Sequence, residues 1–285
     1  MTKSGVLAVV SMLAEGHKWN DLLFPPDWVK RRLAGEKPEP PSKYCNPMFN
    51  DKYKLIYLKC PKNGGTTVMD GYFSHCDLPF HYDYCLHMAD YTNTTEVAHL
   101  NKVWGEYFVF GFSRNVLRRA LSQYKYLATF LKEECHMAWG EYCQDPYLIG
   151  DVCARNDSTG ASCCTQVPPE HQYLHVSPQA NCLTTTTGQY ALDWLGRLEN
   201  FYEDFAELLS ILNARPGVPK IPSELPGQLN NVDPCLNRTL MGTKKGRAKA
   251  RLLKCDKLDF YTGANEHCYD SIRQFYAEDS ALLGL

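Results

Sequence analysis

A β-rich run, a glycine loop and a helical pattern follow one another without a break between residues 54 and 73. The run is KLIYLKC, residues 54–60, and the loop directly after it is PKNGGTT, residues 61–67. From about Thr66 onward the spacing of apolar residues predicts a helix. Its buried face would hold Val68, Met69, Tyr72 and Phe73. Strand, loop and helix in this order are the unit from which α/β domains are built.

Two further pairs of strand and helix repeat this order. The segment EYFVFGF, residues 106–112, precedes a helix with an apolar face at spacings of three and four, namely Leu117, Leu121, Tyr124, Ala128 and Leu131. The segment YALDWLGRLE precedes a second such helix, with Phe201, Phe205, Leu208, Leu209 and Leu212 on its buried stripe. A final helix is predicted over residues 269–283. The pattern predicts an α/β fold with a P-loop-like central parallel sheet flanked by helices.

The length and charge of the chain limit its organisation and partners. A chain of 285 residues with 44% hydrophobic residues is long enough for one large domain. Its net charge of −2 argues against a surface built to grip nucleic acid. We expect an N-terminal segment over residues 1–44, with a weak signal or anchor remnant and a proline-rich linker, and a catalytic domain over residues 45–285. Membrane association is expected only through that segment, and the oligomeric state is not predicted.

The cysteines indicate an oxidising compartment. There are 13 of them, which is many for a cytosolic enzyme. The sequence has no CxxC…CxxC or HExxH pattern, so we predict disulfides and no metal site. We expect Cys60, beside the glycine loop, to be reduced and buried, and residues 132–188 to form a cysteine-rich, disulfide-pinned insert near the mouth of the active site. Acceptor triplets for N-glycosylation at Asn93, Asn156 and Asn237 agree with the secretory pathway.

The glycine loop has the composition of an anion site but not the Walker A sequence. Walker A places lysine after the second glycine, whereas here Lys62 precedes Gly64 and Gly65. Glycines let the backbone approach an anion, and backbone N–H groups at a helix start donate to it. Thr66 and Thr67 add hydroxyl donors. Lysine beside glycines is also common in surface turns, so this loop by itself is weak evidence.

A second candidate for anion binding follows the second predicted strand. Arg114 stands at the strand end, where α/β sheets place ligands, and Ser122 lies eight residues further on. An arginine fork and a serine hydroxyl two turns into the helix can meet on one phosphate. A solvated basic helix is the alternative explanation of this stretch.

Taken together, the two stretches resemble the 5′-phosphosulfate loop and the 3′-phosphate motif of sulfotransferases that use 3′-phosphoadenosine 5′-phosphosulfate (PAPS). They are most similar to the Golgi-type carbohydrate O-sulfotransferases, the group that includes the heparan sulfate 2-O-sulfotransferases and the chondroitin and dermatan enzymes. Three further stretches, in the expected order, resemble segments of that family: HVSPQANCL at 175–183, GRLENFYEDFAELLSIL at 196–212 and IRQFYAEDSALLGL at 272–285.

The resemblance implies a sulfotransferase fold and a set of site residues. PAPS would be bound by Lys62, Asn63, Gly64, Gly65, Thr66, Thr67, Arg114 and Ser122. Lys62 would also act in catalysis, and His87 would be the general base, with His81 second and Asp83 or Asp90 as acidic alternatives. His175 and Gln179 would face the acceptor, or form a structural corner around Pro178. No metal is required by this chemistry.

The chain departs from the family pattern at two places. Asn115 and Val116 stand where the family has Asp-Pro, so we expect the turn into the helix to be less fixed. Gly65 replaces a small hydroxyl residue of the loop, which removes one donor. Neither change removes Lys62, Arg114 or Ser122.

The resemblance predicts transfer of a sulfuryl group from PAPS to a hydroxyl of a glycan or glycosaminoglycan in the Golgi lumen. The alternatives are a sulfotransferase acting on tyrosine or a small alcohol, a nucleotide kinase, and a non-catalytic secreted glycan-binding relative. A basic run at residues 244–254 is consistent with a solvated helix face or with a dock for an acidic glycan.

Overall fold

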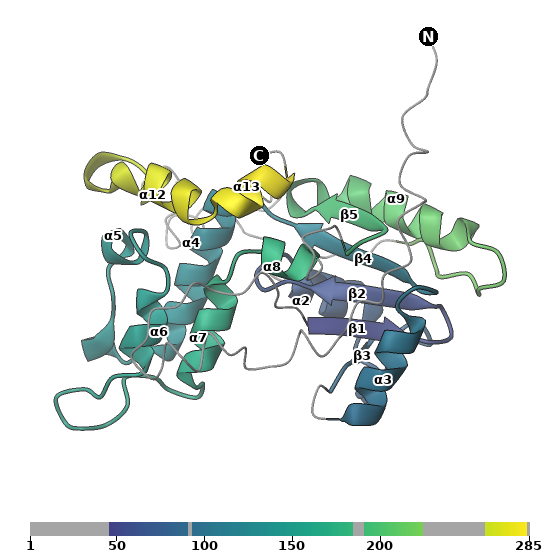
Figure 1. Ribbon diagram of the computed structural model, residues 1–285, viewed down its shortest axis with the longest axis horizontal. Helices are drawn as coiled ribbons and strands as arrows, with labels where there is room; N and C mark the ends of the chain where they lie inside the picture. Colours follow the sequence, from purple (N-terminus) through teal and green to yellow (C-terminus); the bar gives the residue numbers. More distant parts are fainter. Residues whose placement is uncertain (1–45, 91–92, 185–190, 225–259, 284–285) are drawn as a thin grey trace, which may run out of the picture.

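The computed structural model of the protein describes residues 46–90, 93–184, 191–224 and 260–283. A five-stranded sheet with the strand order β3-β1-β2-β4-β5 lies at its centre (Figure 1). The strands are β1 Asn46–Asn50, β2 Leu55–Lys59, β3 His87–Met88, β4 Phe108–Ser113 and β5 Trp194–Arg197. The α/β class predicted from the sequence is confirmed.

The sheet is mixed, which corrects the prediction of a parallel one. The three predicted strands β2, β4 and β5 do pair in parallel. The strand β1 pairs antiparallel with β2 and with β3. A tight turn joins β1 to β2, in which Tyr53 N donates to Asn50 Oδ1 and Lys54 has a φ of 47°. A connection this short permits only antiparallel pairing, and the sequence NPMFN of β1 lacks the β-branched pattern that predicts a strand.

Helices cover both faces of the sheet. On one face lie α2 Gly65–Val68, its π-helical continuation η2 Met69–Phe73, and α9 Phe201–Ala214, packed on Leu55, Tyr57 and Phe110. On the other face lie α3 Thr94–Val103 and α8 Ala180–Leu183. The stripe predicted for α9 is confirmed, because its five apolar residues are all buried.

A cluster of helices packs beside the sheet, on the left of Figure 1. Its members are α4 Val116–Leu127, α5 Trp139–Tyr142, α6 Leu148–Cys153, α7 Pro169–Val176 and α12 His267–Phe275. Single 3-10 turns, η3 Ala128–Phe130, η4 Glu133–Cys135, η5 Leu198–Asn200 and η7 Gly263–Asn265, connect the longer elements.

The final helix predicted over residues 269–283 is two helices, α12 and α13 Ala277–Leu283. They are separated at Tyr276, whose backbone leaves the helical region with φ −102° and ψ 33°. Tyr276 is fully buried, and its hydroxyl oxygen lies within hydrogen-bond distance of two acceptors, Val176 O at 2.8 Å and Gln123 Oε1 at 3.0 Å. The break between the helices coincides with these long-range hydrogen bonds of Tyr276. The spacing of apolar residues in the sequence does not predict such a break.

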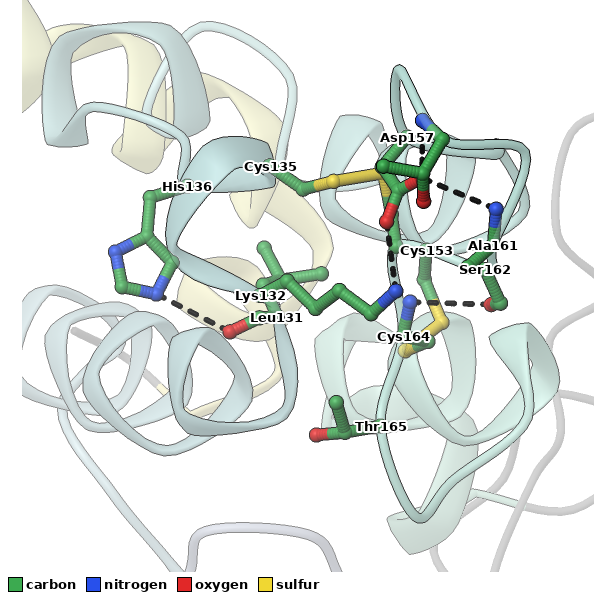
Figure 2. Close-up of a disulfide and its surroundings, with 12 residues drawn as sticks. Leu131, Lys132, Cys135, His136, Cys153, Asp157, Ala161, Ser162, Cys164 and Thr165 are labelled. Carbon is green, nitrogen blue, oxygen red and sulfur yellow. Dashed lines mark hydrogen bonds and ion pairs between the residues drawn. A yellow bond between two sulfur atoms is a disulfide. The ribbon is translucent and has the colours of Figure 1, made fainter.

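Four disulfides lie within the described residues: Cys76–Cys85, Cys135–Cys163, Cys143–Cys268 and Cys153–Cys164. Two of them lie within the segment predicted as cysteine-rich, and Cys143–Cys268 joins that segment to α12. In the same segment Lys132 forms an ion pair with Asp157 at 2.7 Å (Figure 2). Cys60 is buried and reduced, as predicted.

Several predictions fall outside the described residues, namely the segment 1–44, the triplet at Asn237 and the basic run 244–254. Among the described helices, none has the length and apolar content needed to span a bilayer.

Candidate functional site

The glycine loop and Arg114 meet at the carboxyl ends of β2 and β4. The loop follows β2, and Arg114 follows the neighbouring strand β4. Arg114 Nη1 donates to the carbonyl oxygen of Lys62 at 3.1 Å, and Asn63 Nδ2 donates to Phe112 O at 2.8 Å. The structure therefore brings together two stretches that are about fifty residues apart in the sequence.

The loop conformation depends on a left-handed backbone. Lys62 has a φ of 65° and Gly64 a φ of 86°. A side chain at Gly64 would be strained at that φ, and its Cβ would stand 2.5 Å from Leu198 Cδ1. The helix after the loop is α-helical for only four residues before it widens into η2. The α-helical part is therefore too short to offer much of a helix dipole to an anion, and any attraction would come mainly from charged side chains.

Lys62 and Arg114 place two cations at this junction. The half-buried ammonium of Lys62 lies 3.9 Å from the centre of the Tyr126 ring. Burial, with a smaller contribution from Arg114, lowers the pKa of Lys62 to about 8. Within the described chain no carboxylate forms an ion pair with Lys62. An anion bound here would stabilise the charged lysine and raise its pKa.

Gln179 holds the loop and the end of β4 in register. It is fully buried, its Oε1 accepts from Asn63 Nδ2 at 2.8 Å and from Arg114 N at 3.0 Å, and its Nε2 donates to Arg114 O at 2.7 Å. The amide is thus bonded within the chain, and it does not face an acceptor. These bonds agree with the alternative that Gln179 is part of a structural corner around Pro178.

The buried ion pair between Asp279 and Arg119 contacts the backbone of Gln179. Asp279, on α13, accepts from the backbone N of Gln179 at 3.0 Å and of Ala180 at 2.7 Å, and it lies 3.7 Å from Arg119 Nη1. Arg119 also donates to Pro61 O at 3.1 Å, at the start of the loop. Burial raises the pKa of Asp279, and Arg119 opposes that shift. We did not predict a role for Asp279, although the terminal stretch that resembles the family contains it.

Two histidines of α7 pack beside Lys62. His175, predicted from the sequence, and His171, which was missed, have ring centroids 4.0 Å apart. Both rings lie against Tyr126, at 5.2 Å for His175 and 5.9 Å for His171. Burial and then Lys62 lower the pKa of His171. The signal that could have found His171 is its i, i+4 spacing to His175, which places both on one helix face.

Ser122 lies on the same side of α4 as this cluster. It is half-buried and stands one helical turn before Tyr126. At the start of α4 the Asn115 side chain accepts from Leu117 N at 3.1 Å and Arg118 N at 3.3 Å. The expectation of a loosely fixed turn is corrected, because asparagine is a good N-cap. In the loop itself Thr66 is exposed and Thr67 is buried.

The structure does not bring His87 to the loop. His87 is aligned with Phe49 of β1, which is aligned with Ile56 near the start of β2, whereas the loop follows the end of β2. Its two ring nitrogens contact Asp77 at 2.9 Å and Glu96 at 3.3 Å. Partial burial lowers the pKa of His87, but these carboxylates outweigh burial and raise it overall. The register and the two carboxylate contacts argue against a role for His87 as the base beside Lys62.

The second-choice bases are also engaged elsewhere. His81 Nδ1 is 2.7 Å from Leu78 O on an exposed loop. Asp83 pairs with Lys52 at 2.6 Å, in the β1–β2 turn at the opposite end of the sheet from Lys62. The backbone N–H of Asp90 donates to Glu96 Oε2 at 2.8 Å, on the side of the sheet where Glu96 also contacts His87.

One group of potential metal ligands is present among the described residues. The ligand atoms of Cys143, His267 and Cys268 lie within 4.8 Å of one another. Both sulfurs belong to one disulfide, so neither is available as a thiolate.

Neither a family model, nor a curated protein, nor a solved structure matches this chain. A function must therefore be inferred from the junction of the loop with Arg114 and from the short motifs that resemble sulfotransferases.

Proposed function

We propose that the protein is a sulfotransferase that moves a sulfuryl group from PAPS to a hydroxyl of a carbohydrate acceptor. The observation that carries this proposal is the contact between Arg114 and the Lys62 carbonyl. The resemblance to sulfotransferases requires the two stretches to form one site, and the junction of β2 and β4 is consistent with that requirement.

The residues at the junction match the charge that sulfuryl transfer develops. The leaving group, 3′-phosphoadenosine 5′-phosphate (PAP), gains negative charge on its 5′-phosphate as the S–O bond breaks. Lys62 would meet that charge, and the loop N–H groups would donate to the same phosphate. Arg114 and Ser122 would hold the 3′-phosphate, the arginine by its fork and the serine by its hydroxyl.

Two features support the rest of the proposal. The four disulfides are consistent with an oxidising compartment, and we place the enzyme in the secretory pathway, in the Golgi lumen. The acceptor is proposed as a carbohydrate from the motifs that resemble the carbohydrate enzymes. A sulfotransferase acting on tyrosine or a small alcohol would share the PAPS site and differ only in the acceptor.

The test is transfer of labelled sulfate from PAPS to a panel of glycans, tyrosine peptides and small alcohols. We expect glycan sulfation by the wild-type protein, and a loss of about 10²-fold or more in Lys62→Ala, by analogy with the loss of one transition-state donor. Full activity of Lys62→Ala would refute the role of the loop. Glycan and PAP binding without any transfer would instead identify a non-catalytic glycan-binding protein.

A further inference from the structure

The histidine pair of α7 occupies the side of the site that faces Lys62. The ammonium of Lys62 lies over the ring of Tyr126. The same ring contacts the rings of His171 and His175. Phe130 adds an edge contact to His171 at 5.2 Å. These contacts set an imidazole close to the group proposed to meet the leaving phosphate.

The two histidines differ in their hydrogen bonding. His175 Nδ1 lies 2.8 Å from the carbonyl oxygen of His171, one turn earlier. His171 Nδ1 is buried and has no hydrogen-bond partner among the described residues. A neutral imidazole with its proton on Nδ1 leaves Nε2 as the acceptor, and no hydrogen bond to Nε2 of His171 is found within the described residues. His171 as a whole remains only half-buried, which leaves the ring reachable from outside.

We propose that His171 is the general base that accepts the proton of the acceptor hydroxyl. This proposal rests on the proposed sulfotransferase function. In the step, the acceptor O–H bond breaks and its proton passes to Nε2 of His171, because Nδ1 is buried and only the rest of the half-buried ring can be reached from outside. The acceptor oxygen forms a bond to sulfur while the bond from sulfur to the 5′-phosphate oxygen breaks, and the electron pair of that bond stays on PAP. No oxidant or further co-reactant is needed.

The charged and titratable groups around His171 favour its neutral form. Lys62 faces it from the loop, His175 from the same helix and Tyr126 from α4. His175 is in turn close to Lys62 and Arg119, and burial with these neighbours lowers its pKa to about 3. His175 therefore stays neutral near pH 7 and does not compete with His171 for the proton. His171, with a lowered pKa, is a free base at pH 7.

The experiment compares three variants in the sulfate transfer assay. We expect His171→Ala to lower kcat by about 10²–10⁴-fold, the usual contribution of a general base. His171→Asn, which keeps a polar group near the Nδ1 position, should be equally slow. His87→Ala should retain transfer, because His87 lies at the far end of the sheet. PAP binding and thermal unfolding should be unchanged in the His171 variants, which shows that they fold.

Two readouts separate a base from a structural role. In the wild type, kcat should fall as the pH falls below the pKa of His171, and the variants should lack that acid limb. Added imidazole should restore part of the activity of His171→Ala but not of Lys62→Ala. Wild-type kcat in both His171 variants, or loss of transfer in His87→Ala alone, would overturn the assignment and leave the sulfotransferase function standing. An absence of transfer by the wild-type protein on every acceptor would overturn both.

Discussion

Replacing Gln179 with leucine should both destabilise the protein and weaken the PAP binding that we propose. Leucine has a similar volume but cannot hydrogen bond. The change removes the bonds to Asn63 Nδ2, Arg114 N and Arg114 O, at 2.8, 3.0 and 2.7 Å. Asn63 Nδ2 keeps its bond to Phe112 O, so the main loss falls on the backbone of Arg114. Leaving these groups without a partner should cost about 2–4 kcal/mol.

A second buried glutamine provides a matched control. Gln172 on α7 is also fully buried, but its Oε1 has no partner among the described residues, and its Nε2 has only long contacts, to Leu127 O at 3.4 Å and to the weak acceptor Cys164 Sγ at 3.5 Å. That distance is longer than a normal N–H···O bond. Gln172→Leu removes a poorly bonded amide, and its cost should stay below about 1 kcal/mol because the apolar replacement leaves few groups unpaired.

The assay is denaturant unfolding of both variants, with PAP affinity measured by calorimetry. Gln179→Leu should show a lower midpoint at unchanged slope, which marks a change in stability alone. At temperatures where it is folded, it should bind PAP at least tenfold more weakly, because the loop and Arg114 are no longer held together. Equal losses of stability in the two variants, or wild-type PAP affinity in Gln179→Leu, would refute the assigned role of Gln179.

Three further predictions follow from the same contacts. Asp279→Asn should destabilise the protein by about 3 kcal/mol in thermal unfolding, since breaking a buried pair leaves Arg119 without its counter-charge. The pKa of Lys62 is lowered to about 8 in the folded protein, so the charged lysine reduces the free energy of unfolding below pH 8. That reduction should disappear as the pH rises from 8 towards the pKa of the lysine in the unfolded chain. PAP affinity should accordingly weaken as the pH rises through 8 and remain constant in Lys62→Arg, as measured by calorimetry at pH 7 and 9. Removing the Cys143–Cys268 disulfide, whose cysteines are 125 residues apart, should lower the free energy of unfolding by about 5 kcal/mol. Removing Cys76–Cys85, with a separation of 9, should lower it by about 2.5 kcal/mol. Denaturant unfolding of the two double serine variants measures both values.

The sequence predicted the parts of the fold that local patterns determine. The strands β2, β4 and β5 and the stripe of α9 follow from runs and spacings within a few residues. The strand β1 was missed because it is held by its pairing with β2 and not by its own composition. The break at Tyr276 was missed because the buried bonds of its hydroxyl reach residues 100 and 153 positions away.

The candidate site divides in the same way. Lys62 and Arg114 could be found from their positions after two strands, because parallel strands bring their carboxyl ends to one edge. The choice of His87 rests on a match to a short motif, which carries no information on sheet position, and the register aligns His87 with a residue near the start of β2. Gln179 was found by its motif, but its orientation depends on Asn63 and Arg114 and could not be read from its neighbours in sequence.

The site is suited to an anion because the side chains that hydrogen bond to the loop within the described residues are neutral amides and positively charged guanidinium groups. Asn63 and Gln179 join the loop to β4 through amides, which add no negative charge beside Lys62. The carboxylate that supports them, Asp279, is fully buried against Arg119, and it is linked to the loop through the side chain of Arg119 and the backbone of Gln179. A carboxylate at the position of either amide would pair with Lys62 and compete with a bound phosphate. Gln179→Glu should therefore weaken PAP binding more than Gln179→Leu does, although glutamate is the closer match in shape, and equal affinities in the two variants would show that charge at this position does not matter.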